Sequence, residues 1–146
     1  MDQLRSRRTR RKRGHAVVEM ALLSPWILFL FAGALDIGFY SQALTATQNA
    51  ARVAAEYTSK NANTAADSTA ACQYALDELS VMHNVRNLST CGAAPLTVTA
   101  TLVTGPDGAS ASSVSVTYKT EQLIPIPGLA GQFTITRTVE MRLQTS

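Results

Sequence analysis

The sequence predicts an α+β protein with a long N-terminal membrane-spanning α-helix, a second helix and a three-stranded antiparallel sheet. Residues 20–35, MALLSPWILFLFAGAL, form an uncharged apolar run. Residues 40–59 contain no Gly or Pro and carry small or apolar side chains at helical spacing. From Leu96 onward apolar residues alternate with polar ones, which is the period of a strand. The predicted order is therefore apolar helix, amphipathic helix, second helix and strands.

The apolar run has the length and composition of a membrane helix. It lies between two carboxylates, Glu19 and Asp36. About 20 helical residues cross a bilayer core, so one added turn at each end places these acids near the two interfaces. The run is apolar on every face, whereas a helix at the surface of a soluble core needs only one apolar face. We expect one helix over residues 16–58, kinked at Pro25, because proline cannot donate to the Ala21 carbonyl.

The charges are divided sharply between the N-terminus and the rest of the chain. Residues 1–14 hold seven Lys and Arg against Asp2 alone, a net charge of +6, and the remaining residues carry −3. A basic block before a membrane helix places the N-terminus in the cytoplasm and the C-terminal part outside. A nucleic-acid-binding arm is the alternative, but the block has no interleaved aromatics and leads directly into apolar sequence. We expect no nucleic acid partner.

The C-terminal part is predicted to contain one helix and three strands. The helix spans 66–83, with capping-box-like spacing of Thr64 and Asp67 at its start. The strands are predicted over 96–103, 113–120 and 133–143. The first two are joined by the turn sequence GPDGAS. LIPIPGLAGQ joins the second and third as a loop or an edge excursion, because prolines cannot donate to a sheet ladder.

The two cysteines, Cys72 and Cys91, both lie in the part predicted to be exported. An oxidising compartment permits a disulfide between them; free, buried thiols are the alternative. A metal site is not expected, since His83 is the only histidine in that part and no CxxC pair is present. The sequence also lacks the GxSxG, HExxH, P-loop and GxGxxG patterns of common active sites. We expect no enzyme and no cofactor, and an exported body this small favours an assembly subunit.

Two kinds of export signal fit the N-terminus. An ordinary secretory signal would be cleaved after the A-x-A sequence Ala32-Gly33-Ala34, and the alternative function is then a secreted or membrane-anchored extracytoplasmic binding protein. The other cleavage point precedes the apolar run, between Gly14 and His15, where a residue without a side chain leaves the backbone open to a protease at the cytoplasmic face. The carboxylate at the head of the apolar run and the uninterrupted helix beyond Ala34 favour the second.

The stretches RGHAVVEMALLSP, FAGALDIGFY and QALTATQNAARVAAEY resemble the TadE-like pseudopilins of tight-adherence (Tad/Flp) type IV pilus systems. In that family a basic leader ends in Gly, an acid follows five residues on, and a proline lies six residues beyond the acid. A second acid stands near the end of the apolar run, before a Gln-Ala…Ala-Ala-Arg stretch. The matching positions are Gly14, Glu19, Pro25, Asp36, Gln42, Ala43, Ala50, Ala51 and Arg52. The resemblance covers residues 13–57.

The resemblance implies a pilin-like, bacterial, single-pass inner-membrane protein with three parts. These are a cleaved leader (1–14), a transmembrane and continuing amphipathic helix (15–59) and an extracytoplasmic α+β domain (60–146). A prepilin peptidase would cut at Gly14 and His15, and the product would serve pilus assembly or adhesion through packing. Its partners would be other pilin-like subunits, the inner-membrane assembly platform and lipid. The new α-amine of His15 would then be the partner of Glu19, within one helix or between neighbouring subunits.

Overall fold

The computed structural model describes the backbone of residues 2–121 and 131–144 and the side chains from His15 onward within those ranges. The chain divides into two compact units, Met1–Gly38 and Phe39–Ser146, which are described separately. The sequence LIPIPGLAGQ, predicted to be a loop, falls largely outside the described residues.

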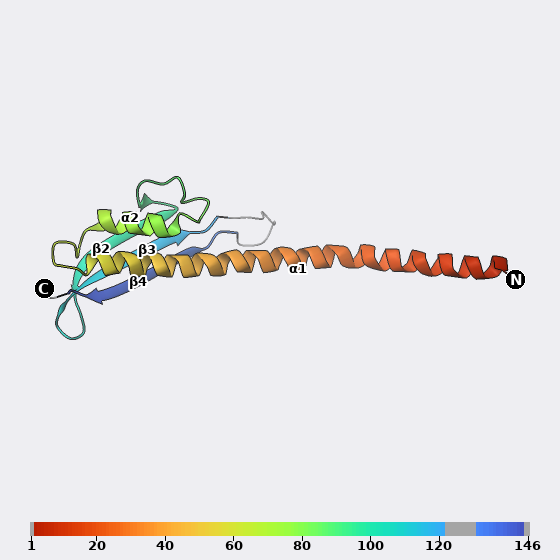
Figure 1. The fold of residues 1–146 in the computed structure, drawn as a ribbon, viewed down its shortest axis with the longest axis horizontal. Coiled ribbons are helices and arrows are strands. Elements are labelled where there is room, and N and C mark those ends of the chain that lie inside the picture. The colour runs from red at the N-terminus through yellow and green to blue at the C-terminus, as the bar shows by residue number, and fades with distance from the viewer. Residues whose placement is uncertain (1, 122–130, 145–146) are drawn as a thin grey trace. The chain divides into compact units, whose positions relative to one another are not determined.

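Helix α1 (Asp2–Thr58) supplies all the described structure of the first unit and the first element of the second (Figure 1). It begins well before residue 16, where the apolar pattern predicted its start, and it ends at the predicted residue. The helix continues through Pro25. Proline leaves the Ala21 carbonyl without its helical donor, and the Ser24 hydroxyl donates to that carbonyl at 3.3 Å. A neighbouring serine thus replaces the missing hydrogen bond, and a kink at Pro25 stays a prediction.

The second unit begins with the C-terminal part of α1, which buries a face made of small residues. These are Ala43, Thr47, Ala50, Ala51, Ala54, Ala55 and Thr58. Their spacing follows the helical period, so they form one stripe that packs into the core. The Thr47 hydroxyl donates to the Ala43 carbonyl at 2.7 Å, which allows a polar side chain to be fully buried.

Helix α2 (Ser68–Leu79) is shorter than predicted. Its N-cap is Asp67, whose carboxylate accepts from the backbone N–H groups of Thr69 and Ala70. The expected capping role of Thr64 was wrong, because its hydroxyl instead bonds the carbonyls of Thr58 and Asn61 in the preceding turn.

Four antiparallel strands form the sheet, in the order β1-β2-β3-β4. They are β1 (Gly92–Ala93), β2 (Leu96–Thr104), β3 (Ser110–Lys119) and β4 (Thr134–Arg142). Three strands were predicted near their observed bounds; the fourth, β1, has only two residues and pairs with the start of β2 across the cis Ala94–Pro95 bond. Gly108 has φ +76° in the turn between β2 and β3, a conformation that favours glycine.

One face of the sheet packs on the helices and the other faces outward. The core joins the alanine face of α1 to Ala75 and Leu79 of α2 and to Leu96, Val114 and Val116 of the sheet. The outward positions of the three long strands carry mainly Thr and Ser, as in the cross-strand row Thr97–Thr117–Thr136. A sheet with one apolar and one polar face alternates in sequence, which is why the strands were predictable.

A disulfide ties the helical layer to the chain that enters the sheet. The Cys72 and Cys91 sulfurs are bonded at 2.01 Å, with a Cα–Cα distance of 5.6 Å. Cys72 lies in α2, and Cys91 directly precedes β1. A buried polar contact holds the end of α1 as well, where the Ser112 hydroxyl of β3 lies 2.7 Å from the Thr58 hydroxyl and 2.8 Å from the Ala65 carbonyl.

Candidate assembly and anchoring site

Three of the predicted site residues lie close together at the head of the apolar stretch of α1. Gly14, His15 and Glu19 are all within the helix. His15 and Glu19 are four residues apart, so they occupy one face about 6 Å apart along the axis. Both side chains are exposed. The side chains of His15 and Glu19 therefore share one side of the helix.

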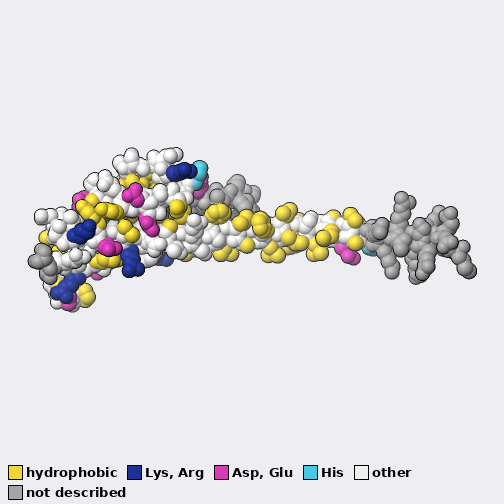
Figure 2. All heavy atoms as spheres, viewed as in Figure 1, with side chains coloured by type: hydrophobic (Ala, Val, Ile, Leu, Met, Phe, Trp, Pro, Cys, Tyr) yellow, Lys and Arg dark blue, Asp and Glu magenta, His cyan; other side chains and the backbone are white. Residues whose placement is uncertain are grey.

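The side chains that follow are apolar and exposed all around the helix. The large ones that are exposed are Val17, Val18, Met20, Leu22, Leu23, Trp26, Ile27, Leu28, Phe29, Leu30, Phe31 and Leu35. Figure 2 shows hydrophobic side chains along the surface of this stretch. The best 18-residue window has a mean hydropathy of 1.9, and none of it is buried by the chain itself. A long apolar helix of this composition is consistent with membrane anchoring.

The other two predicted residues of this helix lie further along it. Pro25 is six residues beyond Glu19, and Asp36 is seventeen residues beyond it, about 26 Å along the helix axis. The structure therefore groups Gly14, His15 and Glu19 and leaves Pro25 and Asp36 outside that group. Cys72 and Cys91 belong to the second unit.

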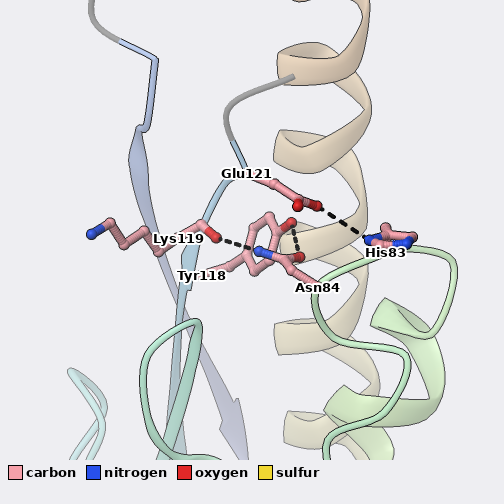
Figure 3. Close-up of polar contacts among 5 residues, drawn as sticks. All are labelled: His83, Asn84, Tyr118, Lys119 and Glu121. Carbon is pink, nitrogen blue, oxygen red and sulfur yellow. Dashed lines mark hydrogen bonds and ion pairs between the residues drawn. The ribbon is translucent and has the colours of Figure 1, made fainter. Parts of the chain in front are cut away.

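A polar cluster in the second unit was not foreseen from the sequence (Figure 3). The Tyr118 hydroxyl donates to the Asn84 side-chain oxygen at 2.7 Å, and the Asn84 side-chain nitrogen donates to the Lys119 carbonyl at 3.0 Å. Tyr118 is 3% exposed, and burial raises the pKa of its phenol. The cluster fastens the chain after α2 to the end of β3.

His83 stands beside this cluster, in the turns that follow α2. Its expected place on the second helix was wrong, because α2 ends at Leu79. Its Nδ1 lies 3.4 Å from a carboxylate oxygen of Glu121. With 90% of the His83 side chain exposed, this is a surface contact, not a built site.

Together these features define the class: an α+β, pilin-like protein with a long apolar N-terminal helix consistent with membrane anchoring. Residues 14–56 match the model of the TadE-like protein family. The match implies a pilin-like protein associated with the Tad pilus and its machinery, since the TadE-like family consists of generally non-enzymatic structural proteins. No curated protein matches the chain, and no solved structure matches it.

Proposed function

We propose that this chain is a minor pilin or pseudopilin of a Tad-type pilus, cleaved between Gly14 and His15 by a prepilin peptidase. The observation that carries the proposal is the placement of Gly14, His15 and Glu19 together at the head of an apolar helix that the chain itself does not cover. The protein acts by packing with other pilin-like subunits and with the inner-membrane assembly platform.

The charge distribution supports an orientation with the N-terminus in the cytoplasm. The seven basic residues of the leader precede the apolar helix, and basic residues stay on the cytoplasmic side. The C-terminal domain is then extracytoplasmic, where its Cys72–Cys91 disulfide persists under oxidising conditions.

Cleavage supplies a partner for Glu19. An unpaired carboxylate in lipid is costly, and cleavage creates an α-amine at His15, one helical turn away. Between staggered helices, the amine of one subunit reaches Glu19 of the next and fixes the register of the assembly. Lipid lines the rest of the apolar surface until assembly.

The mature N-terminus, determined by intact mass and N-terminal sequencing of protein from membranes of a cell with the Tad system, tests this function. We expect His15. An N-terminus at Leu35 would instead identify a secreted protein with an ordinary signal peptide, and an uncut chain would identify a plain anchor. Gly14→Leu should abolish the cut. Gly33→Leu is the matched control, because a Cβ at Gly33 meets no atom within 4 Å, and it should be processed normally.

A further inference from the structure

A groove beside the disulfide is a feature of the C-terminal domain that the proposed function leaves unused. It has a volume of about 270 Å³ and lies between the start of α2, the segment that precedes β1, and Val98 of β2. Both cysteines line it, together with the hydroxyl side chains of Ser68, Thr69, Ser89 and Thr90. Three of these four, Thr69, Ser89 and Thr90, are exposed residues. The disulfide therefore borders a groove that is open to solvent.

The two cysteines are more accessible than the residues among which they pack. Cys72 is 9% exposed and Cys91 is 7% exposed, whereas Ala71, Ala75 and Leu79 of α2 are all 0% exposed. Access matters for the chemistry of the bond, because disulfide exchange begins when a thiolate reaches one of the two sulfurs. The groove gives a thiolate a path to the bond without the core being opened.

The polar lining of the groove suits a polypeptide segment that carries a thiolate. Among the described residues that line it, none is acidic or basic, so no carboxylate repels the negative sulfur. The carboxylate of Asp67 is not part of the lining and is bound as the N-cap to the N–H groups of Thr69 and Ala70. The hydroxyl groups and the amide of Gln73, which also lines the groove, can each donate and accept hydrogen bonds. Such groups fit the N–H and C=O groups of an extended chain.

Hydrogen bonds hold both ends of the disulfide in place independently of the S–S bond. The Ala100 N–H donates to the Ser68 hydroxyl at 2.9 Å, which fastens the start of α2 to β2. The Val98 N–H donates to the Cys91 carbonyl at 3.2 Å, which fastens the second cysteine to the same strand. Neither contact involves a sulfur atom. The two cysteines therefore stay close together when the bond opens, and the bond can form again.

We propose that this groove is a thiol–disulfide exchange site, at which a protein dithiol opens and re-forms the Cys72–Cys91 bond in the folded domain. The sulfur attacked is that of Cys91. Its chain neighbours Thr90 and Gly92 are both exposed, whereas Cys72 lies within α2 next to the buried Ala71. The site lies entirely in the second unit and goes beyond the proposed function, because it does not depend on how the N-terminus is processed.

The exchange takes place in two balanced steps. A thiolate of the partner bonds to the Cys91 sulfur, and the S–S bond breaks with its electron pair leaving on Cys72, which takes a proton from solvent. The second thiolate of the partner then attacks the partner's own first sulfur and releases Cys91, which is protonated in turn. The partner dithiol loses two electrons and two protons and becomes a disulfide, and the cysteine pair becomes two thiols. The reverse reaction forms the bond.

The rate of reduction of the purified full-length protein in detergent tests the site. The probe is reduced thioredoxin, a protein with a Cys-x-x-Cys dithiol, and the thiols formed are alkylated and counted by mass spectrometry. We expect the bond to be reduced faster than the domain unfolds, at a rate that denaturant does not change below the unfolding transition. A rate equal to that of unfolding, rising with denaturant from the lowest concentration, would overturn the proposal, because the bond would then open only in the unfolded chain.

Two tryptophan variants test whether the groove is the path to the bond. Thr69→Trp and Thr99→Trp add the same ring at exposed threonines. The first lines the groove, and the second lies on the outward face of the sheet, since its neighbour Val98 lies on the groove side. We expect Thr69→Trp to slow reduction at least ten-fold and Thr99→Trp to be reduced at the wild-type rate, with the Tm of both unchanged. Equal rates for the two variants would contradict the proposal. If Thr69→Trp fails to fold, the denaturant dependence of the wild type decides.

A trapping experiment identifies the sulfur that is attacked. Thioredoxin in which the second cysteine is replaced by serine cannot complete the second step, so it should remain bonded to the chain. Peptide mass spectrometry should place this bond at Cys91. A bond at Cys72, or no trapped complex, would overturn the proposed route. A mature N-terminus other than His15 would refute the proposed function and leave this result standing.

Discussion

The two stretches of α1 use apolar residues in opposite ways. Between Val17 and Leu35 the large apolar side chains are exposed, whereas from Ala43 to Thr58 the buried side chains are small. Small residues let a helix approach a sheet closely, so alanine serves packing within the domain. The large residues pack on nothing in their own unit. A high apolar content therefore marks the core of the protein in one stretch and, in the other, an uncovered surface consistent with membrane anchoring.

Glu19 offers the largest expected effect and tests whether the first stretch is an assembly surface. Glu19→Ala removes the proposed partner of the His15 amine and so leaves that charge unpaired in an apolar environment, which is costly. We expect surface pili, counted by electron microscopy, to fall at least ten-fold. Glu56→Ala, at an exposed carboxylate in the second stretch, is the control and should assemble normally. Wild-type piliation by Glu19→Ala would remove the proposed role of this residue.

One leucine in the first stretch, Leu23, and one in the core on which the second stretch packs, Leu79, allow a comparison of their contributions to stability. Leu79 is 0% exposed, whereas Leu23 is 55% exposed. Leu79→Ala leaves a cavity in the core and should lower the free energy of unfolding of the C-terminal domain by about 2–5 kcal/mol. Leu23→Ala should change it by less than about 0.5 kcal/mol. Denaturant unfolding in detergent measures both, followed by the near-ultraviolet tyrosine signal, because all four tyrosines lie beyond Phe39. Equal losses would mean that the first stretch also stabilises the domain.

The disulfide lies entirely in the second unit, Phe39–Ser146, and its removal should leave the apolar helix of the first unit unaffected. Replacing Cys72 and Cys91 together by serine releases a loop with a sequence separation of 19. The expected loss is about 3 kcal/mol, or a decrease in Tm of roughly 10–20 °C for a domain of this size. Membrane insertion and the mature N-terminus should not change. A Tm that does not fall would show that α2 and the sheet hold together without the bond.

Substitution of Tyr118 should have the smallest effect on stability, and that effect should depend on pH. Its folded-state pKa is raised by burial, so the folded domain holds the phenol proton more tightly than the unfolded chain. This stabilisation is present in full below the unfolded pKa of about 10 and is lost as the pH rises through the folded value. Tyr118→Phe should lower the free energy of unfolding by about 0.5–1.5 kcal/mol at pH 7, because the hydrogen bond to Asn84 is lost.

The stability of the two proteins above pH 8 separates the effect of the Tyr118 phenol proton from a general loss of packing in Tyr118→Phe. Thermal unfolding between pH 8 and 11 should show a steeper loss of stability in the wild type than in Tyr118→Phe. Parallel curves for the two proteins would assign the alkaline loss to other groups.

Local patterns predicted most of the fold. The helical spacing in α1, the alternation in the strands and the GPDGAS turn each depend on neighbours in sequence, and each element was found. The end of α2 was misplaced for a specific reason. Met82 keeps helical spacing after Leu79, yet its N–H bonds the Leu79 carbonyl in a tight turn at 2.9 Å. Because this turn keeps Met82 at helical spacing from Leu79, the apolar pattern continues past the residue at which the helix ends.

Long-range contacts could not be predicted in the same way. Asn84 and Tyr118 are 34 residues apart, and neither carries a local signal for the other. The strand β1 is too short to show a period. At the candidate site, the spacing of Gly14, His15 and Glu19 fixes their grouping as soon as the segment is helical, which is why these residues were found from sequence alone.

The position of the disulfide has a mechanical consequence for an anchored protein. The bond joins Cys72 to Cys91, so α1 lies outside the covalent loop. A pull transmitted from the membrane enters the C-terminal domain at Phe39. It is resisted by the alanine face of α1, the Tyr40–Phe133 contact and the hydrogen bond between Gln144 and Ser59. No disulfide opposes the separation of α1 from the sheet, whereas α2 stays bonded to the chain before β1. The rate at which α1 separates from the sheet then sets how long a tethered subunit holds.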